Sequence, residues 1–307
     1  MERSEMPQTT PEIDRYLLGD NPFIGVDHLS QERARERLKW IDTDRIVEVI
    51  DTAFASGAQG LLFSTHPIMY DALKRIKARS DSPAFGLYPL LPYAQSYVRT
   101  ATEKGIIGLA QEVLSRLSWR ARAKALAGGA LSLASIDPKG ILVRYIDAEL
   151  DILSRNAPDG ATLKSVFLHE ILTDLGTSFQ AAELIQAYAN HILDNYCVKP
   201  GFATRNFPKF VGFATASGLR LDQIVILTPF NSAGFQMNPS REACEQTLAQ
   251  LPDANMIAMS ILASGYLRLN DALEYIAKQK AIRSFVVGVS TQAHARETFS
   301  QMRSTLG

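Results

Sequence analysis

Eight short apolar runs recur along almost the whole chain, and their alternation with other segments constrains the fold more than any other feature. Each run is rich in Val, Ile, Leu or Phe and is followed by turn or polar residues. Unbroken apolar runs of this kind are typical of parallel strands covered on both faces. The runs occupy residues 15–26, 60–65, 84–91, 165–171, 209–215, 223–230, 255–261 and 284–289.

Amphipathic segments lie between the runs. In residues 43–57, for example, Ile46, Val49, Ile50 and Phe54 recur at helical spacing, and a glycine ends the pattern. Eight strands that are each followed by a helix predict an α/β fold, a closed (β/α)8 (TIM) barrel. A competing interpretation makes residues 129–135 a ninth strand, which would suit an open doubly wound sheet.

The length of 307 residues fits one such barrel with an insertion. Residues 1–12 are polar and predict a flexible N-terminal tail. Residues 13–307 predict a single barrel domain, in which residues 93–137 form a helical insertion after the third strand.

Composition excludes several classes of function. Thirty-two basic residues balance thirty-two acidic ones, which argues against a nucleic-acid or membrane-surface protein. Cys197 and Cys244 provide no disulfide framework, so a reducing cytoplasm is expected. No apolar run approaches the roughly 20 residues that span a bilayer. The expected partner is a small molecule; the oligomeric state is not indicated.

Polar residues stand where the expected strands end, and catalysis in (β/α)8 barrels takes place at those ends. A ring of polar groups there predicts a solvated pocket. The candidate substrate-binding residues are Asp20, Asn21, Tyr88, Thr215, Phe230, Asn231 and Ser260.

His169 and Glu170, at the end of the fourth run, are the sharpest catalytic candidates. An imidazole can exchange a proton near neutral pH, and a carboxylate can orient it. His66 is a third candidate. The structural alternatives are a loop-fixing His169, a Glu170 paired with a lysine, and a helix-capping His66.

The segment 288–299 predicts an anion site. Gly288 ends the eighth run, and Ser290 and Thr291 precede the last helix, whose free N–H groups and dipole favour phosphate. Alternatively, the hydroxyl of Ser290 or Thr291 is an ordinary N-cap of the last helix, which also explains why these residue types occur there.

No metal or cofactor is required by these motifs. Asp20, His66, His169 and Glu170 could supply two nitrogens and two oxygens to a divalent metal, but the last four strands end without His, Asp or Glu.

The second half of the chain resembles the aldo-keto reductases in "SVFLHEI", "VGFATASG", "VILTPFN", "AMSILASGYL" and "FVVGVSTQAHARETF". The resemblance implies a (β/α)8 barrel that binds NADP(H) across strands five to eight. It places the family's histidine at His169 and its nicotinamide-stacking ring at Phe230, beside Asn231. The resemblance also aligns residues 260–267 with the loop after strand seven, and residues 288–297 with the last phosphate-binding loop.

The chain departs from that family at its catalytic groups. Leu62, Phe63 and Ser64 stand where the family's aspartate is expected, and residues 84–92 contain no lysine. Tyr70 lies near the position of the family's tyrosine, but without Lys and Asp its pKa would not be depressed.

The sequence therefore favours a TIM-barrel enzyme that acts on a small polar metabolite, including phosphorylated ones, by His-centred acid–base chemistry of the lyase or isomerase type. One alternative is an aldo-keto-reductase-like NAD(P)H-dependent oxidoreductase acting on a carbonyl. Another is a catalytically silent barrel that serves as a binding subunit.

Overall fold

A computed structural model describes residues 10–26, 32, 41–81, 83–92 and 138–307. The expected tail up to residue 9, the expected insertion 93–137 and the suggested strand 129–135 lie outside these residues.

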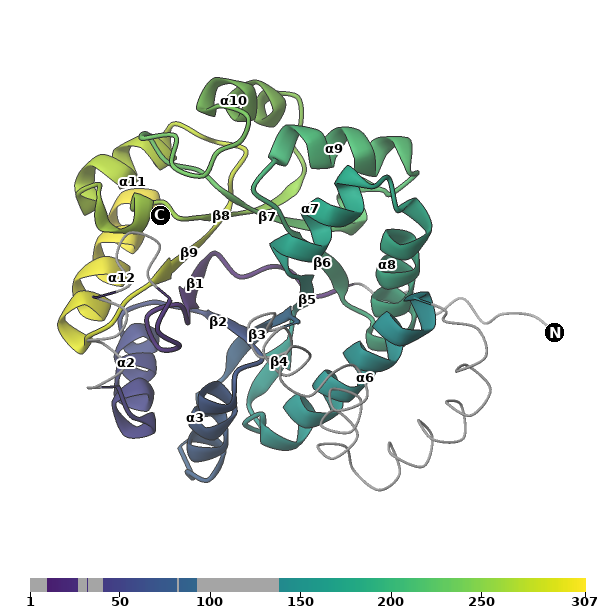
Figure 1. The fold of residues 1–307 in the computed structure, drawn as a ribbon. Coiled ribbons are helices and arrows are strands. Elements are labelled where there is room, and N and C mark those ends of the chain that lie inside the picture. The colour runs from purple at the N-terminus through teal and green to yellow at the C-terminus, as the bar shows by residue number, and fades with distance from the viewer. Residues whose placement is uncertain (1–9, 27–31, 33–40, 82, 93–137) are drawn as a thin grey trace, which may run out of the picture.

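Nine parallel strands close into a barrel with eight positions (Figure 1). Strands at successive positions pair with one another, and β9 returns to β1. β4 and β5 flank Lys164 and share the fourth position beside β3. The strands are β1 (Tyr16–Gly19), β2 (Gly60–Ser64), β3 (Phe85–Leu91), β4 (Ala161–Leu163), β5 (Ser165–Leu168), β6 (Lys199–Ala203), β7 (Val225–Pro229), β8 (Asn255–Met259) and β9 (Ser284–Gly288).

Helices surround the barrel in chain order (Figure 1). They are α2 (Thr43–Ala55), α3 (Pro67–Lys77), α6 (Pro138–Asn156), α7 (Glu170–Ser178), α8 (Ala182–Tyr196), α9 (Phe207–Ala216), α10 (Arg241–Ala249), α11 (Leu269–Ala277) and α12 (Gln292–Leu306), with 3-10 turns at Leu221–Gln223 and Ala263–Gly265. The closed (β/α)8 barrel is confirmed, and the open-sheet alternative is wrong.

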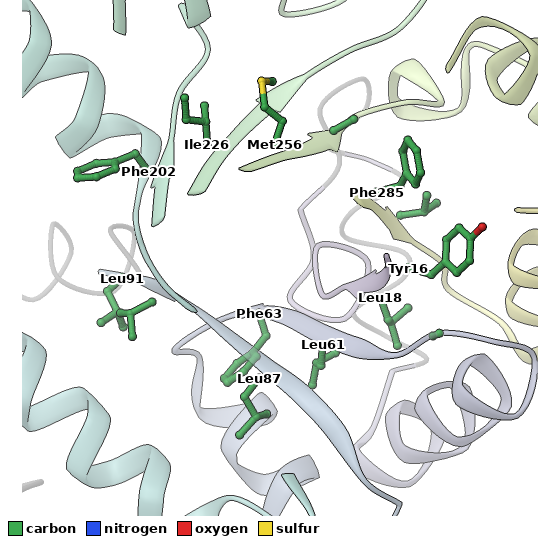
Figure 2. Packing of buried hydrophobic residues seen from close by; sticks show 14 of the residues in the cluster. Tyr16, Leu18, Leu61, Phe63, Leu87, Leu91, Phe202, Ile226, Met256 and Phe285 are labelled. Carbon is green, nitrogen blue, oxygen red and sulfur yellow. The ribbon is translucent and has the colours of Figure 1, made fainter. Parts of the chain in front are cut away.

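Side chains alternate along the strands between two apolar clusters. Leu17, Leu62 and Phe167 belong to the cluster inside the barrel. Leu18 and Phe63, the neighbours of two of them, belong to the cluster between strands and helices, which Figure 2 shows from close by. Burial of each large apolar side chain contributes about 1.5–3 kcal/mol, so the two apolar faces of strands such as β1 and β2 both favour closure.

The fifth strand is not where the apolar pattern places it. Residues 209–215 lie in α9, whose buried Phe207, Phe210 and Phe213 recur at helical spacing. The strand is β6 instead, which contains Pro200 and Gly201, two residue types depleted in strands. Gly201 is required because a Cβ there would lie 2.4 Å from the ring of Phe167. Close packing against an aromatic ring therefore overrides strand propensity here.

Candidate active site at the mouth of the barrel

A cavity of about 900 Å³ opens at the carboxyl ends of the strands. This size is at the upper end of the range for ligand pockets. Its wall includes Asp20 and Asn21 after β1, His169 and Glu170 after β5, Arg205 after β6, Ser260 after β8, and Gly288 and Ser290 at the end of β9. These residues come from both halves of the chain, so closure of the barrel is what brings them together.

Asp20 is the most deeply buried acidic group of this wall, at 2% exposure. Its Oδ2 accepts a hydrogen bond from the backbone N–H of Ser64, 2.8 Å away, at the end of the adjacent strand β2. Burial raises the pKa of Asp20 to about 7, against the opposing effect of this hydrogen bond. A carboxyl that titrates near neutral pH beside a cavity is suited to donate and accept a proton.

His169 precedes α7 and caps it. Its Nδ1 accepts from the N–H of Ile171 at 3.3 Å, so the hydrogen of the neutral ring lies on Nε2. Nε2 is 3.4 Å from Oε2 of Glu170. Burial lowers the pKa of His169, although the nearby carboxylate opposes this effect. The imidazole is therefore held neutral, with a defined tautomer, at the edge of the cavity.

Glu170 joins His169 to a third group, Arg205. The other carboxylate oxygen of Glu170 accepts from Arg205 at 2.8 Å. The Arg205 backbone N–H donates to Asp174, which also accepts from the hydroxyl of Thr204. The Nε of Arg205 is buried without a hydrogen-bond partner. The ion pair is thus anchored by Asp174 on α7 and by the backbone that follows β6.

The loop after β8 has an unusual backbone. Ser260, Ala263, Ser264 and Gly265 all have positive φ, from 46° to 88°. Three of them, Ser260, Ser264 and Gly265, line the cavity. Side chains disfavour this conformation, which tends to cluster at ligand sites where the surrounding structure enforces it. A Cβ on Gly265 would meet no atom within 4 Å, so the backbone at Gly265 faces open space.

A further part of the cavity wall is formed by the end of β9, which pairs with β1, and the first turns of α12. Ser290, His294, Glu297 and Thr298 face the cavity there. Thr291 does not line it: its hydroxyl accepts from the N–H of His294 at 3.2 Å and caps α12. The capping alternative therefore describes Thr291, whereas Ser290 and Gly288 lie beside the cavity as the anion-site prediction requires.

Four predicted substrate-binding residues lie away from the cavity wall. Tyr88 lies in the middle of β3, and its hydroxyl donates to Asp14, which precedes the first strand. It therefore points to the opposite end of the barrel. Thr215 is exposed on α9, because the fifth strand was placed wrongly.

Phe230 and Asn231 are the other two. Phe230 is fully buried, and its ring packs edge-on against Phe207 with centroids 5.9 Å apart. The Asn231 side chain exchanges two hydrogen bonds with the backbone of Phe235 and closes its own loop. Phe230 is thus not placed to stack on a ligand, and Met259 lines the cavity instead.

His66 begins α3 as its N-cap, and its Nδ1 accepts from the N–H of Ile68 at 3.2 Å. Burial lowers the pKa of His66. It is not among the residues that line the cavity, so the capping alternative describes its observed contact.

Arg205 is the functional candidate that the sequence did not reveal. Its signal was the segment "KPGFATRNF", in which an apolar stretch ends in polar residues. The Pro and Gly within that stretch concealed the strand.

The structure also locates the tyrosine of the reductase resemblance. The Tyr70 hydroxyl donates to Glu149 on α6, at 2.8 Å, and Tyr70 does not line the cavity. β3 ends in Leu90 and Leu91 and holds no lysine. The family's proton-donating arrangement is therefore not assembled from the described residues.

Within the described residues, no group of three or more His, Cys, Asp or Glu side chains is in a position to hold a metal ion. No helix there is long and apolar enough to cross a membrane.

Comparisons with known proteins place the fold. No protein-family model matches the chain, and a search of curated proteins found no match. Among solved structures, one described as "the putative aldo-keto reductase" from Pseudomonas aeruginosa is similar, with a TM-score of 0.54 and 11% identity over 96% of this chain and 92% of that one. A second structure described in the same terms, from the same organism, has a TM-score of 0.54 and 12% identity over 96% and 91%. At such identities the likeness concerns the fold, and the chain is an aldo-keto-reductase-like (β/α)8 barrel.

Proposed function

We propose that this protein is an NAD(P)(H)-dependent oxidoreductase that interconverts a carbonyl compound and its alcohol at the mouth of the barrel. The observation that carries the proposal is that one cavity among the described residues joins two unlike walls. One wall holds Asp20, His169 and Arg205, and the other consists of the β8 loop and the start of α12. The likeness in fold to aldo-keto reductases supports this function over the lyase or isomerase chemistry that the sequence alone favours.

The wall formed by β8, β9 and α12 fits a dinucleotide. Phosphates bind well at a helix N-terminus, where backbone N–H groups and the helix dipole favour negative charge. Gly288 and Ser290 stand at that place, and the exposed backbone around Gly265 permits close approach of a flat or bulky group. When bound, the cofactor supplies or accepts the hydride. The residues that would hold it are Gly288, Ser290, Ser264 and Gly265.

In this proposal Asp20 donates the proton that carbonyl reduction requires and accepts it in the reverse reaction. Carbonyl reduction consumes one proton, and the described residues present no lysine-activated tyrosine at the cavity. Oδ2 of Asp20 is occupied by the N–H of Ser64, so the proton sits on Oδ1. A carboxyl with a pKa of about 7 is protonated often enough to donate and basic enough to recover the proton.

His169 and Arg205 orient the substrate. The neutral imidazole presents its Nε2 hydrogen, and Glu170 together with Arg205 holds the ring in place. Arg205 lines the cavity, and its guanidinium carries five N–H donors, so those not used by Glu170 can bond a polar group of the substrate.

The test combines binding with turnover. The purified protein is titrated with NADH and with NADPH by calorimetry, and each complex is then supplied with a panel of aldehydes and ketones while the nicotinamide absorbance is followed. We expect saturable binding of at least one dinucleotide and its oxidation by at least one carbonyl compound.

Ser290→Glu is the matched variant. A carboxylate near the start of a helix stabilises that helix, but it repels phosphate. We expect this variant to fold at least as stably as the wild type and to lose dinucleotide binding. Absence of binding by the wild-type protein at millimolar dinucleotide would refute the proposal and favour the non-redox chemistry.

A further inference from the structure

Both carboxylate oxygens of Asp174, in the middle of α7, bond the turn that follows β6. Its Oδ1 accepts a hydrogen bond from the hydroxyl of Thr204 at 2.5 Å, and its Oδ2 accepts from the backbone N–H of Arg205 at 3.2 Å. The Thr204 hydroxyl in turn accepts from the N–H of Asn206, the N-cap of α9, at 3.0 Å. One carboxylate therefore fixes three successive residues at the mouth of the barrel.

Arg205 is held both at its backbone and at its side chain. Its N–H donates to Asp174, and its C=O accepts from the N–H of Asn238 at 3.1 Å. Its guanidinium then returns to α7, where it donates to Glu170 at 2.8 Å. Asp174 follows Glu170 by four residues, so the two carboxylates are neighbours along one side of α7. The helix thus holds Arg205 at two points, the backbone by Asp174 and the guanidinium by Glu170.

Asp174 contributes less to the stability of α7 than to this contact. Asp is among the poorer helix formers, and Asp174 stands half-buried at the centre of the helix. Burial raises the pKa of Asp174, and the hydrogen bond from Thr204 opposes this effect. A charged group that is costly to bury, and whose two oxygens both bond one turn, is the kind of residue that is retained at a functional site.

We infer that Asp174 is a positioning residue of the candidate active site: it fixes the backbone of Arg205, so that the guanidinium lies beside Glu170 and faces the cavity, where it bonds the substrate. The inference rests on the proposed function. Arg205 lines the cavity and Asp174 is not among the residues that line it, so Asp174 acts through Arg205 and does not touch the substrate.

Loss of Asp174 should weaken substrate binding more than it slows the chemical step. A group that bonds the substrate equally in the ground state and in the transition state sets KM and leaves kcat unchanged. In Asp174→Ala we expect KM for the carbonyl compound to rise about tenfold, as loss of one hydrogen bond to a charged group implies, and kcat to change less. Asp174→Asn keeps one acceptor oxygen and should lie between this variant and the wild type.

Thr173→Val is the matched control. Thr173 is the neighbour of Asp174 on α7 and is fully buried, and its hydroxyl donates to the C=O of Leu168 at 3.2 Å. Valine has a similar shape but cannot donate this bond, so the variant destabilises the same helix without changing a bond to Arg205. We expect its KM to match the wild type. In an Arg205→Gln background, Asp174→Ala should raise KM little further, because residues that act as one unit are not additive.

The position of Arg205 can also be measured without substrate. Its Nε atom is buried, so the proton on it should exchange slowly with water and give a resolved NMR signal, assigned by its loss in Arg205→Lys. We expect this signal in the wild type and in Thr173→Val. In Asp174→Ala the signal should broaden or disappear, because the released side chain exposes the proton to water.

The outcomes separate the positioning role from the proposed function. Absence of the Arg205 signal in the wild type, or its persistence in Asp174→Ala, would overturn the positioning role. A lost signal with an unaltered KM, or fully additive effects in the double variant, would show that Asp174 does not act on substrate binding through Arg205. Failure of the wild type to reduce any carbonyl compound would overturn the proposed function, while the NMR signal would still decide whether Asp174 positions Arg205.

Discussion

The two walls of the cavity are built on different principles. The wall from β1 to β6 presents charged side chains that are held by one another, as in the contacts of Glu170 with His169 and Arg205. The wall from β8 to α12 combines residues of positive φ after β8 with polar side chains at the start of α12, among them Ser290 and His294. Side chains can tune pKa values, while exposed N–H groups can bind an anion without a permanent charge. The division suggests that proton transfer belongs to the first wall and phosphate binding to the second.

Asp20 provides the strongest test of this division, because it concerns the chemistry of the first wall alone. Asp20→Asn keeps the size and the hydrogen bond from Ser64 but removes the titrating proton. We expect turnover to fall about 10²–10⁴-fold, the range for general acid–base groups, while the dissociation constant of NADH stays unchanged. Asp20→Glu serves as a control that retains a carboxyl group. Unaltered turnover in Asp20→Asn would remove Asp20 from the mechanism.

The stability of the folded protein should also report on Asp20. Its pKa is raised from 3.8 to about 7, so the folded state binds a proton that the unfolded state releases at lower pH. Stability from this group is therefore fully present below about pH 4 and is lost as the pH rises through 7. A shift of about three units corresponds to roughly 4 kcal/mol.

Urea unfolding of the wild type and Asp20→Asn at pH 5 and pH 8 measures this effect. The wild type should lose stability relative to the variant at the higher pH. Parallel pH dependences in the two proteins would show that Asp20 ionises normally.

His169→Asn should produce a smaller effect on the first wall. Asn is a good N-cap, so it can replace the ring as acceptor of the Ile171 N–H and preserve α7. We expect the protein to fold normally and turnover to fall about 10–100-fold through loss of substrate orientation. Wild-type turnover in this variant would assign His169 a capping role alone.

The smallest expected effects distinguish two neighbouring hydroxyls of the second wall. Thr291→Ala removes the cap of α12 and should cost about 1 kcal/mol of stability, with NADH binding unchanged. Ser290→Ala should leave stability nearly unchanged and weaken NADH about threefold to tenfold, as loss of one hydrogen bond implies. Thermal unfolding and calorimetry on both variants check the pair. The reverse assignment of the two effects would exchange their roles.

Elements that depend on local sequence could be predicted, whereas elements that depend on contacts between distant residues could not. The strands β7, β8 and β9 could be predicted because continuous apolar sequence and parallel burial coincide there. The strand β6 could not be predicted, because its Gly201 is required by close packing against the ring of Phe167, which is distant in the sequence. Because the fifth strand was predicted at residues 209–215, Thr215 was assigned to the site and Arg205 was not.

Side-chain direction was equally beyond the sequence. The sequence predicts Tyr88 near the mouth of the barrel, but its hydroxyl donates a hydrogen bond to Asp14 at the other end. Asp20 could be placed at the mouth, whereas its raised pKa depends on burial against β2. The position of a residue along a strand can be predicted from the local sequence, whereas its burial depends on contacts with distant parts of the chain.

Crystals of the protein grown with NADH test the central claim most directly. We expect the dinucleotide in the cavity, with its phosphates against Gly288 and Ser290 and its reactive end facing Asp20. A dinucleotide bound elsewhere on the molecule, with the cavity holding only solvent, would contradict it.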